Sequence, residues 1–500
     1  MSSPGNWSTE MIGFLLLWAC SEPELPPPAP APIPVEDTTK RADPCHLAGP
    51  EEGPSVVVLV SFDTARADGF SVYGTPEADT PIVDSLANCG VRFSQALSHV
   101  PTTLNSHTTM LSGEDPHGHG VVRNGYQLSP DLPLLQERFK ASGWDTLAVV
   151  GSMALETQMG LSRGFEVYDQ AFRVGPGLPY EDRADGVTLR ALEAVDQRSD
   201  SSRPLFLFVH YYDPHLPWDS APAEVRSRFA DPDYQGPISW KREDAQMLQR
   251  VFFQGGLSDA DLHQARQLYR AELNWTDQQL GLLLEGLDAR GLGANRLVVL
   301  TSDHGETIGD WPVESVPLAT GRLYHKVPIG HGDDVSTVNL QVPLVMHGRG
   351  SLSLPAGTVV DDLVGLMDVA PTVLAIAGMD SELGSGRSLV GHWQGSPPEA
   401  APHFAEATKP GQVERLDAWN NLDFDRRVTW NGVVYRDIPW IPRGPLITDS
   451  AGMALHVDDT VRRTLAGLLA DWDAQAPDWR PKEMSDETES ALEALGYIDR

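Results

Sequence analysis

Acidic and imidazole side chains follow three separate apolar runs of the chain. They are Asp63 after residues 56–60, Asp213 and His215 after residues 205–209, and Asp303 and His304 after residues 297–300. Buried carboxylates and imidazoles that crowd together without a cation repel one another or stay unsatisfied. We therefore expect a divalent metal ion at the point where these residues meet. A mixed set of Asp and His ligands suits zinc or manganese better than calcium.

The three runs have the composition of strands that are buried on both faces. Two further runs of this kind occupy residues 146–150 and 343–346, and amphipathic helical patterns lie at residues 132–141, 184–196, 259–290 and 363–377. Alternating strands and helices predict an α/β fold with a mostly parallel central sheet sandwiched by helices. Ligands bind such sheets outside the carboxyl ends of the strands, which is where the acidic and imidazole side chains lie.

A hydroxyl nucleophile is indicated by the segment that follows Pro101. A helix should begin near Thr103 and end at Gly113, because Thr suits the start of a helix and Gly the residue just past its end. A hydroxyl at a helix N-terminus lies in the positive end of the helix dipole, and an adjacent metal would lower its pKa. His107 lies four residues on, on the same helical face. The alternative is that Thr102 or Thr103 only caps the helix.

The alternating pattern also predicts the domain boundaries. Residues 54–390 form the predicted catalytic domain, whereas residues 391–500 lose the alternation. In this second segment, residues 428–435 indicate a hairpin with Asn431-Gly432 at its turn. Helices are expected at residues 459–470 and in a segment that ends at Leu495. We therefore expect a small C-terminal α+β subdomain.

The composition excludes several classes of function. The 500 residues carry 70 Asp and Glu against 37 Lys and Arg, for a formal net charge of −33. Such a surface repels nucleic acid, so no nucleic-acid partner is expected. Three cysteines cannot supply a disulfide framework or a Cys-rich zinc site.

Residues 1–20 are predicted to be a signal segment. The apolar run that ends at Ala19 is too short to span a bilayer as a permanent helix, but it suits the apolar part of a secretory signal. The run leads into Cys20 in a box that resembles a bacterial lipoprotein cleavage site. We expect an exported protein, in the periplasm or on the outer membrane as a lipoprotein, whose membrane contact is a lipid on Cys20. The alternative is a frayed hydrophobic terminus.

A Pro-rich tether is predicted at residues 21–53, because this segment has many prolines, little apolar content and no period. If Cys20 carries a lipid, Cys45 and Cys89 remain. An oxidising compartment would permit a disulfide between them.

Several motifs resemble the sulfatase branch of the alkaline phosphatase superfamily. They are Asp63-Thr64-Ala65-Arg66-Ala67-Asp68, Thr80-Pro81, Gly90-Val91-Arg92-Phe93, residues 103–113 and 116–121, Asn124, Ser302-Asp303-His304-Gly305-Glu306, Gly330-His331-Gly332 and Ala494-Leu495-Gly496-Tyr497-Ile498. Their order and spacing hold over most of the chain. The resemblance implies an alkaline phosphatase-like fold and a metal-dependent ester hydrolase.

The resemblance also implies a role for each matching residue. The metal ligands would be Asp63, Thr103, Asp303 and His304, and Thr103 would also be the nucleophile. Contacts to the oxygens of the ester, or help to the leaving group, are implied for His107, Asn124, His215 and His331. In two-metal relatives, positions like Asp213, His215 and His331 hold a second ion. The number of ions, one or two, and the identity of the metal, zinc, manganese or calcium, therefore stay open.

The chain departs from true sulfatases at the nucleophile. Those enzymes carry a cysteine or serine that is oxidised to formylglycine, whereas Thr103 has a methyl group on Cβ and would give a ketone. They also usually have a second Asp where this chain has Thr64, Pro and Arg where it has Asn105 and His107, and commonly Asn where it has His304. These changes resemble the threonine-nucleophile relatives, which cleave phosphodiesters, phosphonate esters or nucleotides.

Three functions therefore stay open. The first is hydrolysis of phosphoesters, mono- or diesters, through a covalent intermediate at Thr103. The second is an arylsulfatase-like hydrolysis of sulfuric esters without formylglycine. The third is ligand binding by a surface lipoprotein that does no catalysis. The expected substrate is a small-molecule, glycan or lipid ester, and the sequence does not indicate which one.

Overall fold

The computed structural model describes residues 55–121, 123–172, 181–239, 256–310, 314–317, 323–326, 329–408, 424–438 and 444–476. The predicted signal segment at residues 1–20 and the tether at residues 21–53 lie outside these residues, as does the helix expected to end at Leu495.

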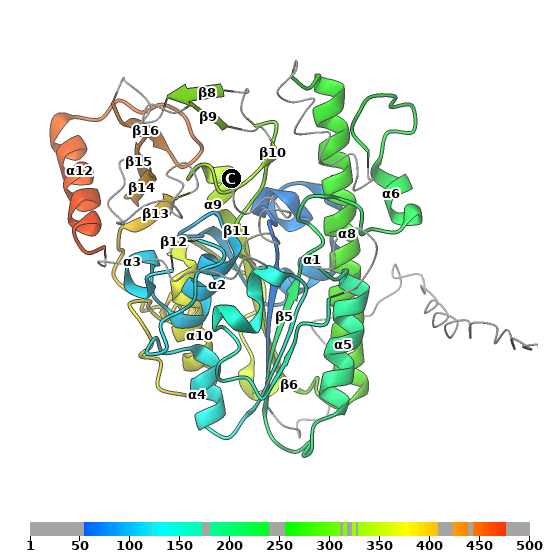
Figure 1. The fold of residues 1–500 in the computed structure, drawn as a ribbon. Helices are drawn as coiled ribbons and strands as arrows, with labels where there is room; N and C mark the ends of the chain where they lie inside the picture. Colours follow the sequence, from blue (N-terminus) through cyan, green and yellow to red (C-terminus); the bar gives the residue numbers. More distant parts are fainter. Residues whose placement is uncertain are drawn as a thin grey trace, which may run out of the picture. The chain divides into compact units, whose positions relative to one another are not determined.

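An eight-stranded sheet forms the centre of the fold, and its strands β5, β6, β11 and β12 are labelled in Figure 1. The strand order is β12-β2-β11-β6-β1-β5-β3-β4. Its strands are β1 (Ser55–Phe62), β2 (Val91–Leu97), β3 (Asp145–Val150), β4 (Val167–Asp169), β5 (Leu205–Tyr211), β6 (Asn295–Ser302), β11 (Gln341–Gly348) and β12 (Thr358–Gly365). β11 runs antiparallel to both of its neighbours, and the other pairs are parallel. The predicted α/β fold with a mostly parallel sheet is confirmed.

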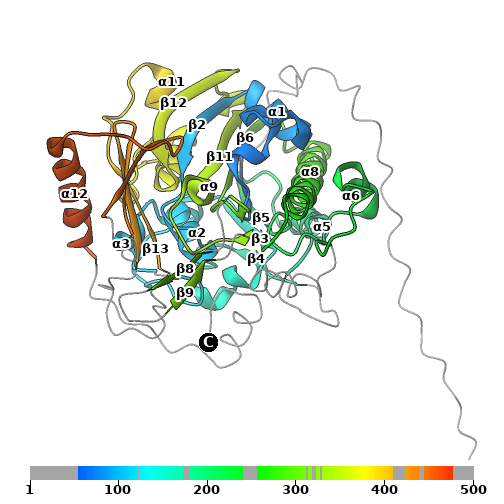
Figure 2. The same cartoon turned by 90° about the horizontal axis from the view of Figure 1, so that it is seen from above.

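Helices cover both faces of this sheet. One face carries α2 (Thr103–Ser112), α4 (Leu135–Ala141) and α10 (Val369–Ile376), and the other carries α1 (Pro81–Asn88), α5 (Ala184–Asp196) and α8 (Asp259–Ala289). Successive residues of β1 alternate between two cores, because Val57 and Leu59 pack in the first and Val56 and Val58 in the second. Figures 1 and 2 show α5 and α8 on the opposite side of the sheet from α2.

The sequence predicted most of these helices well. Residues 184–196 and 259–290 are confirmed as α5 and α8, whereas α4 begins at Leu135 rather than at residue 132. The helix expected at residues 363–377 is wrong in its first part, because residues 358–365 form β12. Among the described strands, this strand pairs only with β2, and its register shifts between Val360 and Leu363. The shift interrupts the two-residue alternation by which a strand is recognised.

A four-stranded antiparallel sheet follows the main sheet along the chain. It consists of β13 (His403–Ala407), β14 (Asp425–Trp430), β15 (Val433–Asp437) and β16 (Leu446–Asp449), and α12 (Asp459–Asp473) packs against it. The predicted hairpin and helix are confirmed. Asn431 and Gly432 have φ angles of 49° and 75°, the positive values that a two-residue turn of this type requires.

Shorter elements complete the described part of the chain. They are α3 (Pro116–His119), α6 (Ala223–Phe229), α9 (Thr337–Leu340), α11 (Gly391–Gln394), β7 (Thr307–Ile308), β8 (Glu314–Pro317), β9 (Leu323–Lys326) and β10 (Ile329–Gly330). Within the described residues, no helix has both the length and the apolar character needed to cross a membrane. Cys89 is disulfide-bonded. Cys20 and Cys45 lie outside the described residues, so the Cys45–Cys89 pairing stays a prediction.

Candidate metal centre and active site

Three of the predicted metal ligands meet at the carboxyl ends of two adjacent strands. Asp63 follows β1, and Asp303 and His304 follow β6, its parallel neighbour in the sheet. One ligand atom from each of these residues lies within 4.8 Å of the others, and all three side chains are fully buried. We call these three residues the metal cluster. It is the only such group of His, Cys, Asp or Glu in the part of the chain that the structure describes.

The polar atoms of the metal cluster fit a divalent cation. Both carboxylate oxygens of Asp63, Oδ2 of Asp303 and Nε2 of His304 are buried and have no hydrogen-bond partner among the described residues. Burial raises the pKa of Asp63 well above its usual value, and the negative charge of Asp303 raises it further. Buried polar atoms are normally satisfied, and a cation would satisfy all of these at once.

Local contacts orient two of these ligands. The backbone N–H groups of Thr64 and His304 donate to Oδ1 of Asp303 at 3.1 and 2.8 Å, so Oδ2 remains for a cation. The Nδ1–H of His304 donates to Gly305 O at 3.0 Å, which leaves the lone pair on Nε2, as is usual for a histidine that binds a metal. Thr64 has a φ of 56°, a strained value for a β-branched residue that costs roughly 1–3 kcal/mol. The strain lies directly beside the metal cluster.

The predicted nucleophile lies at the first residue of α2. Thr103 is fully buried, and its Oγ1 has no hydrogen-bond partner in the described structure. Asn124 Oδ1 accepts the Leu104 N–H at 2.7 Å, while the side chain of Thr102 makes no capping bond. The hydroxyl of Ser106 donates to the backbone oxygen of Asp303 at 2.6 Å, which ties α2 to the metal cluster. The side chain of Asn124, rather than that of Thr102, therefore accepts an N–H at the start of α2.

His107 has contacts that differ from its predicted role. Its Nδ1–H donates to Thr103 O at 2.7 Å, so Nε2 accepts from the hydroxyl of Ser61 at 2.9 Å in the neutral ring. Burial lowers the pKa of His107, which favours this neutral form. With both ring nitrogens engaged, His107 fixes α2 to β1. Its contact with the ester stays a prediction. The sequence placed Thr103 and His107 on the same helical face, but it did not indicate that His107 contacts Ser61 on β1.

Two predicted imidazoles lie next to the metal cluster. The ring of His331 lies 4.4 Å from that of His304, and its Nδ1–H donates to Glu306 Oε1 at 3.1 Å. The ring of His215 lies 4.9 Å from that of His331, and its Nδ1 is 2.7 Å from the hydroxyl of Tyr212. Burial, and then the neighbouring His331, lower the pKa of His215 to about 3. His215 is therefore a neutral group near pH 7.

The predicted second metal site is not assembled. Asp213 Oδ1 accepts the N–H of Ala184 at 2.9 Å, so this carboxylate caps the start of α5. Burial raises the pKa of Asp213 to about 7. Asp213, His215 and His331 do not form a group at ligand distance among the described residues. Asp213 and His215 are close in the sequence, which suggested a shared site. In the structure, the carboxylate of Asp213 instead accepts a hydrogen bond at the start of α5.

His210 is a buried site residue to which the sequence assigned no role. It lies on β5 opposite Ser61 of β1, is fully buried, and places Nε2 3.2 Å from Asp63 Oδ2. A polar residue inside an otherwise apolar strand was the available signal. Burial lowers the pKa of His210 well below its usual value, and the neighbouring His107 lowers it further.

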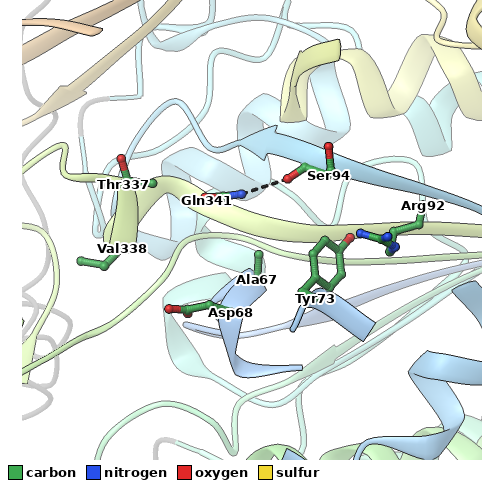
Figure 3. A pocket seen from close by; sticks show the side chains of 8 residues that line it. All are labelled: Ala67, Asp68, Tyr73, Arg92, Ser94, Thr337, Val338 and Gln341. Atoms are coloured by element: carbon green, nitrogen blue, oxygen red, sulfur yellow. Dashed lines mark hydrogen bonds between the residues drawn. The ribbon is translucent and has the colours of Figure 1, made fainter. Parts of the chain in front are cut away.

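A separate cavity of about 310 Å³ does not contain the metal cluster. Figure 3 shows Asp68, Tyr73, Arg92 and Gln341 among its lining residues. The guanidinium of Arg92 lies over the ring of Tyr73 at 5.1 Å, and Gln341 donates to Ser94 O at 2.9 Å, so these polar groups already have partners. The metal cluster, with its unsatisfied buried atoms, is the better candidate for a functional site.

Comparison with known proteins identifies the family of this chain. The family model described as Sulfatase matches residues 55–379. The chain belongs to the sulfatase family. Within this family, it is 26% identical over 276 residues to the ulvan-active sulfatase of Formosa agariphila, a match that covers 51% of this chain and 51% of that protein. The chain thus spans about half the length of that relative.

Two further relatives extend the comparison of this sulfatase family member. An arylsulfatase of Clostridium perfringens is 24% identical over 379 residues, which cover 64% of this chain and 74% of that protein. The crystal structure of a phosphonate monoester hydrolase of Agrobacterium radiobacter superposes with a TM-score of 0.61 at 20% identity, over 84% of this chain and 95% of that one. The structural likeness confirms the predicted alkaline phosphatase-like fold.

Proposed function

We propose that this protein is a metal-dependent hydrolase that cleaves phosphoesters, mono- or diesters, through a covalent intermediate at Thr103. One observation carries the proposal. Unsatisfied buried atoms of Asp63, Asp303 and His304 converge at the end of β1 and β6, beside a helix whose first residue is Thr103. The threonine hydroxyl is itself buried and without a hydrogen-bond partner in the described structure. An alcohol in this setting suits nucleophilic catalysis.

Asp63, Asp303 and His304 would hold the divalent cation, together with the oxygen of Thr103. When bound, the cation supplies positive charge that favours the ionised hydroxyl and stabilises charge on the ester oxygens. The imidazole ligand favours zinc or manganese over calcium. The ligand atoms of the described residues form one site, so a single ion is the simpler proposal.

The remaining residues would act on the ester itself. The Oγ1 of Thr103 forms a bond to phosphorus while the bond to the leaving-group oxygen breaks, and the leaving group takes up a proton. Water then cleaves the phosphothreonine and restores the hydroxyl. Nδ2 of Asn124 is buried and has no partner among the described residues, so it can donate to a non-bridging oxygen. His331 lies beside His304, and His215 lies beside His331. Both would contact the other oxygens or the leaving group.

Hydrolysis of sulfuric esters is the second candidate. The curated relatives reported above are named sulfatases, which favours it. The methyl group on Cβ of Thr103 opposes it, because the residue cannot become the aldehyde formylglycine. A threonine alkoxide can attack phosphorus directly, which favours the phosphoester.

Paired substrates test the proposal. Turnover of 4-nitrophenyl phosphate, bis(4-nitrophenyl) phosphate and 4-nitrophenyl sulfate is measured for wild type, Thr103→Ser and Thr103→Ala, with and without a chelator. We expect the wild type to turn over the phosphoesters and the chelator to abolish this turnover. Thr103→Ser should retain part of the turnover, and Thr103→Ala should lower it by about 10³-fold or more. Near-wild-type turnover by Thr103→Ala would refute the nucleophile. Sulfate turnover alone would favour the second candidate, and no turnover at all would favour ligand binding without catalysis.

We also propose that the protein is exported, with a lipid on Cys20 as its membrane contact and a small-molecule, glycan or lipid ester as substrate. The disulfide at Cys89 supports an oxidising compartment. Partitioning of the wild type and of Cys20→Ser between detergent and aqueous phases tests the anchor. Equal partitioning of the two would contradict it.

A further inference from the structure

The two carboxylates of the metal cluster differ in how they are held. Asp303 has two backbone N–H groups on Oδ1, which fix the direction of Oδ2. Neither oxygen of Asp63 has a hydrogen-bond partner within the described residues. Carboxylates that bind metals are usually held by a second hydrogen bond, and loss of that partner weakens metal binding. A donor to Asp63 is therefore the missing part of the site.

His210 stands where this donor is needed. Its Nε2 lies 3.2 Å from Asp63 Oδ2, within reach of an N–H···O hydrogen bond, and both side chains are fully buried. Neither of its ring nitrogens has a hydrogen-bond partner in the described structure. Within the described part of the chain, no other acceptor therefore takes the N–H of His210.

Strand register places His210 beside Asp63. Ser61 of β1 pairs with His210 of β5, and the N–H of Asp63 donates to Tyr211 O at 2.8 Å. Side chains two residues apart on a strand share a face, so Ser61 and Asp63 point to the same side as their neighbour His210. His107 closes this group from α2, with its ring edge-on to that of His210 at 4.9 Å.

We propose that His210 is the positioning residue of Asp63: its Nε2–H donates to Oδ2 and leaves Oδ1 for the cation. Direct metal binding by His210 fits the structure less well. His304 has its Nδ1–H held by Gly305 O, which presents the Nε2 lone pair, whereas no hydrogen bond from the described residues fixes the tautomer of His210 in this way. His210 also does not belong to the group of ligand atoms that lie within 4.8 Å of one another. The inference rests on the metal site of the proposed function.

Metal affinity provides the test. The full-length protein is stripped with a chelator and titrated with Mn²⁺ by calorimetry, for wild type, His210→Gln and His210→Leu. A Gln amide nitrogen falls near the position of Nε2 and can donate, whereas Leu cannot. We expect His210→Leu to raise the Kd for Mn²⁺ by about 10–100-fold, and His210→Gln to restore most of the affinity.

A matched control separates positioning from packing. His117 is also buried, lies 3.2 Å from a carboxylate oxygen of Glu406, and stacks on Trp472 outside the metal cluster. His117→Leu should leave the Kd for Mn²⁺ unchanged. Thermal unfolding of each metal-free variant reports its fold. If His210→Leu does not fold, His210→Asn replaces it, because the shorter amide cannot reach the position of Nε2.

Two results would overturn the inference. The first is a folded His210→Leu or His210→Asn variant with wild-type affinity for Mn²⁺. The second is an X-ray absorption spectrum of the zinc-loaded protein that counts one imidazole fewer in His210→Gln than in wild type, which would make His210 a ligand. Because both measurements follow the metal and not turnover, they stay informative even if the proposed hydrolysis is wrong.

Discussion

Replacing Asp63 with asparagine should change stability in opposite directions with and without metal. In the metal-free protein, ligand atoms of Asp63 and Asp303 lie within 4.8 Å of each other in a fully buried site. Two unit charges at that separation repel by about 3.5 kcal/mol at an effective dielectric constant of about 20. Asp63→Asn removes this repulsion. The free energy of unfolding of the metal-free variant should therefore exceed that of wild type, by up to about 3.5 kcal/mol.

Metal binding reverses the order of the two free energies of unfolding, so that the wild type becomes more stable than Asp63→Asn. A cation at a thousandfold excess over its Kd adds about 4 kcal/mol to the free energy of unfolding, and Asp63→Asn loses most of this gain because it lacks a ligand.

The difference in stability between the metal-free variant and the metal-free wild type also depends on pH. Burial and the charge of Asp303 raise the pKa of Asp63 in the folded protein, so ionisation of this group is unfavourable there. The difference should appear as pH rises from the ordinary carboxylate pKa toward the raised one, and vanish in acid.

Unfolding by urea, with a chelator or with Mn²⁺, measures both effects. Asp277→Asn is the matched control, because Asp277 is also buried but accepts the N–H groups of Ile82 and Val83 at the start of α1. This control should lose stability equally with and without metal. Two results would contradict this prediction. The first is a metal-free Asp63→Asn variant that is less stable than the metal-free wild type, and the second is a wild type whose stability the chelator leaves unchanged.

Three further predictions follow from other contacts. Asn124→Asp keeps the oxygen that accepts the Leu104 N–H but loses the Nδ2 donor. The fold should therefore persist, while turnover falls about 10²-fold. Unchanged turnover would show that Asn124 only caps the helix. Burial raises the pKa of Asp277 from 3.8 to about 8, so the folded state retains a proton that the unfolded state releases, and stability should fall as pH rises between these values. Asp277→Asn should flatten this slope in urea unfolding at several pH values, and an equal slope would contradict the assignment. Arg436→Met leaves the buried carboxylate of Asp425 without its ion-pair partner and should lower the free energy of unfolding by roughly 3–5 kcal/mol in denaturant titrations, whereas a loss below about 1 kcal/mol would show that the pair contributes little.

The metal cluster could be predicted because its determinants are local. Asp63 and the pair Asp303 and His304 each follow an apolar run, and parallel strands end at the same edge of a sheet. The start of α2 at Thr103 was equally readable, since its helix and its terminal glycine at residue 113 form one continuous segment. Local pattern and fold agree at these positions, so a single sequence was enough.

The sequence by itself thus determined the α/β sheet, the grouping of Asp63, Asp303 and His304 at its edge, and the start of α2 at Thr103. Tertiary structure alone decided the partners of the other polar side chains. His107 accepts a hydrogen bond from Ser61, Asp213 accepts one at the start of α5, and His210 lies beside Asp63. Each of these contacts joins residues that are far apart in the chain or on different elements. Their geometry depends on strand register and helix packing, which local composition and spacing do not encode.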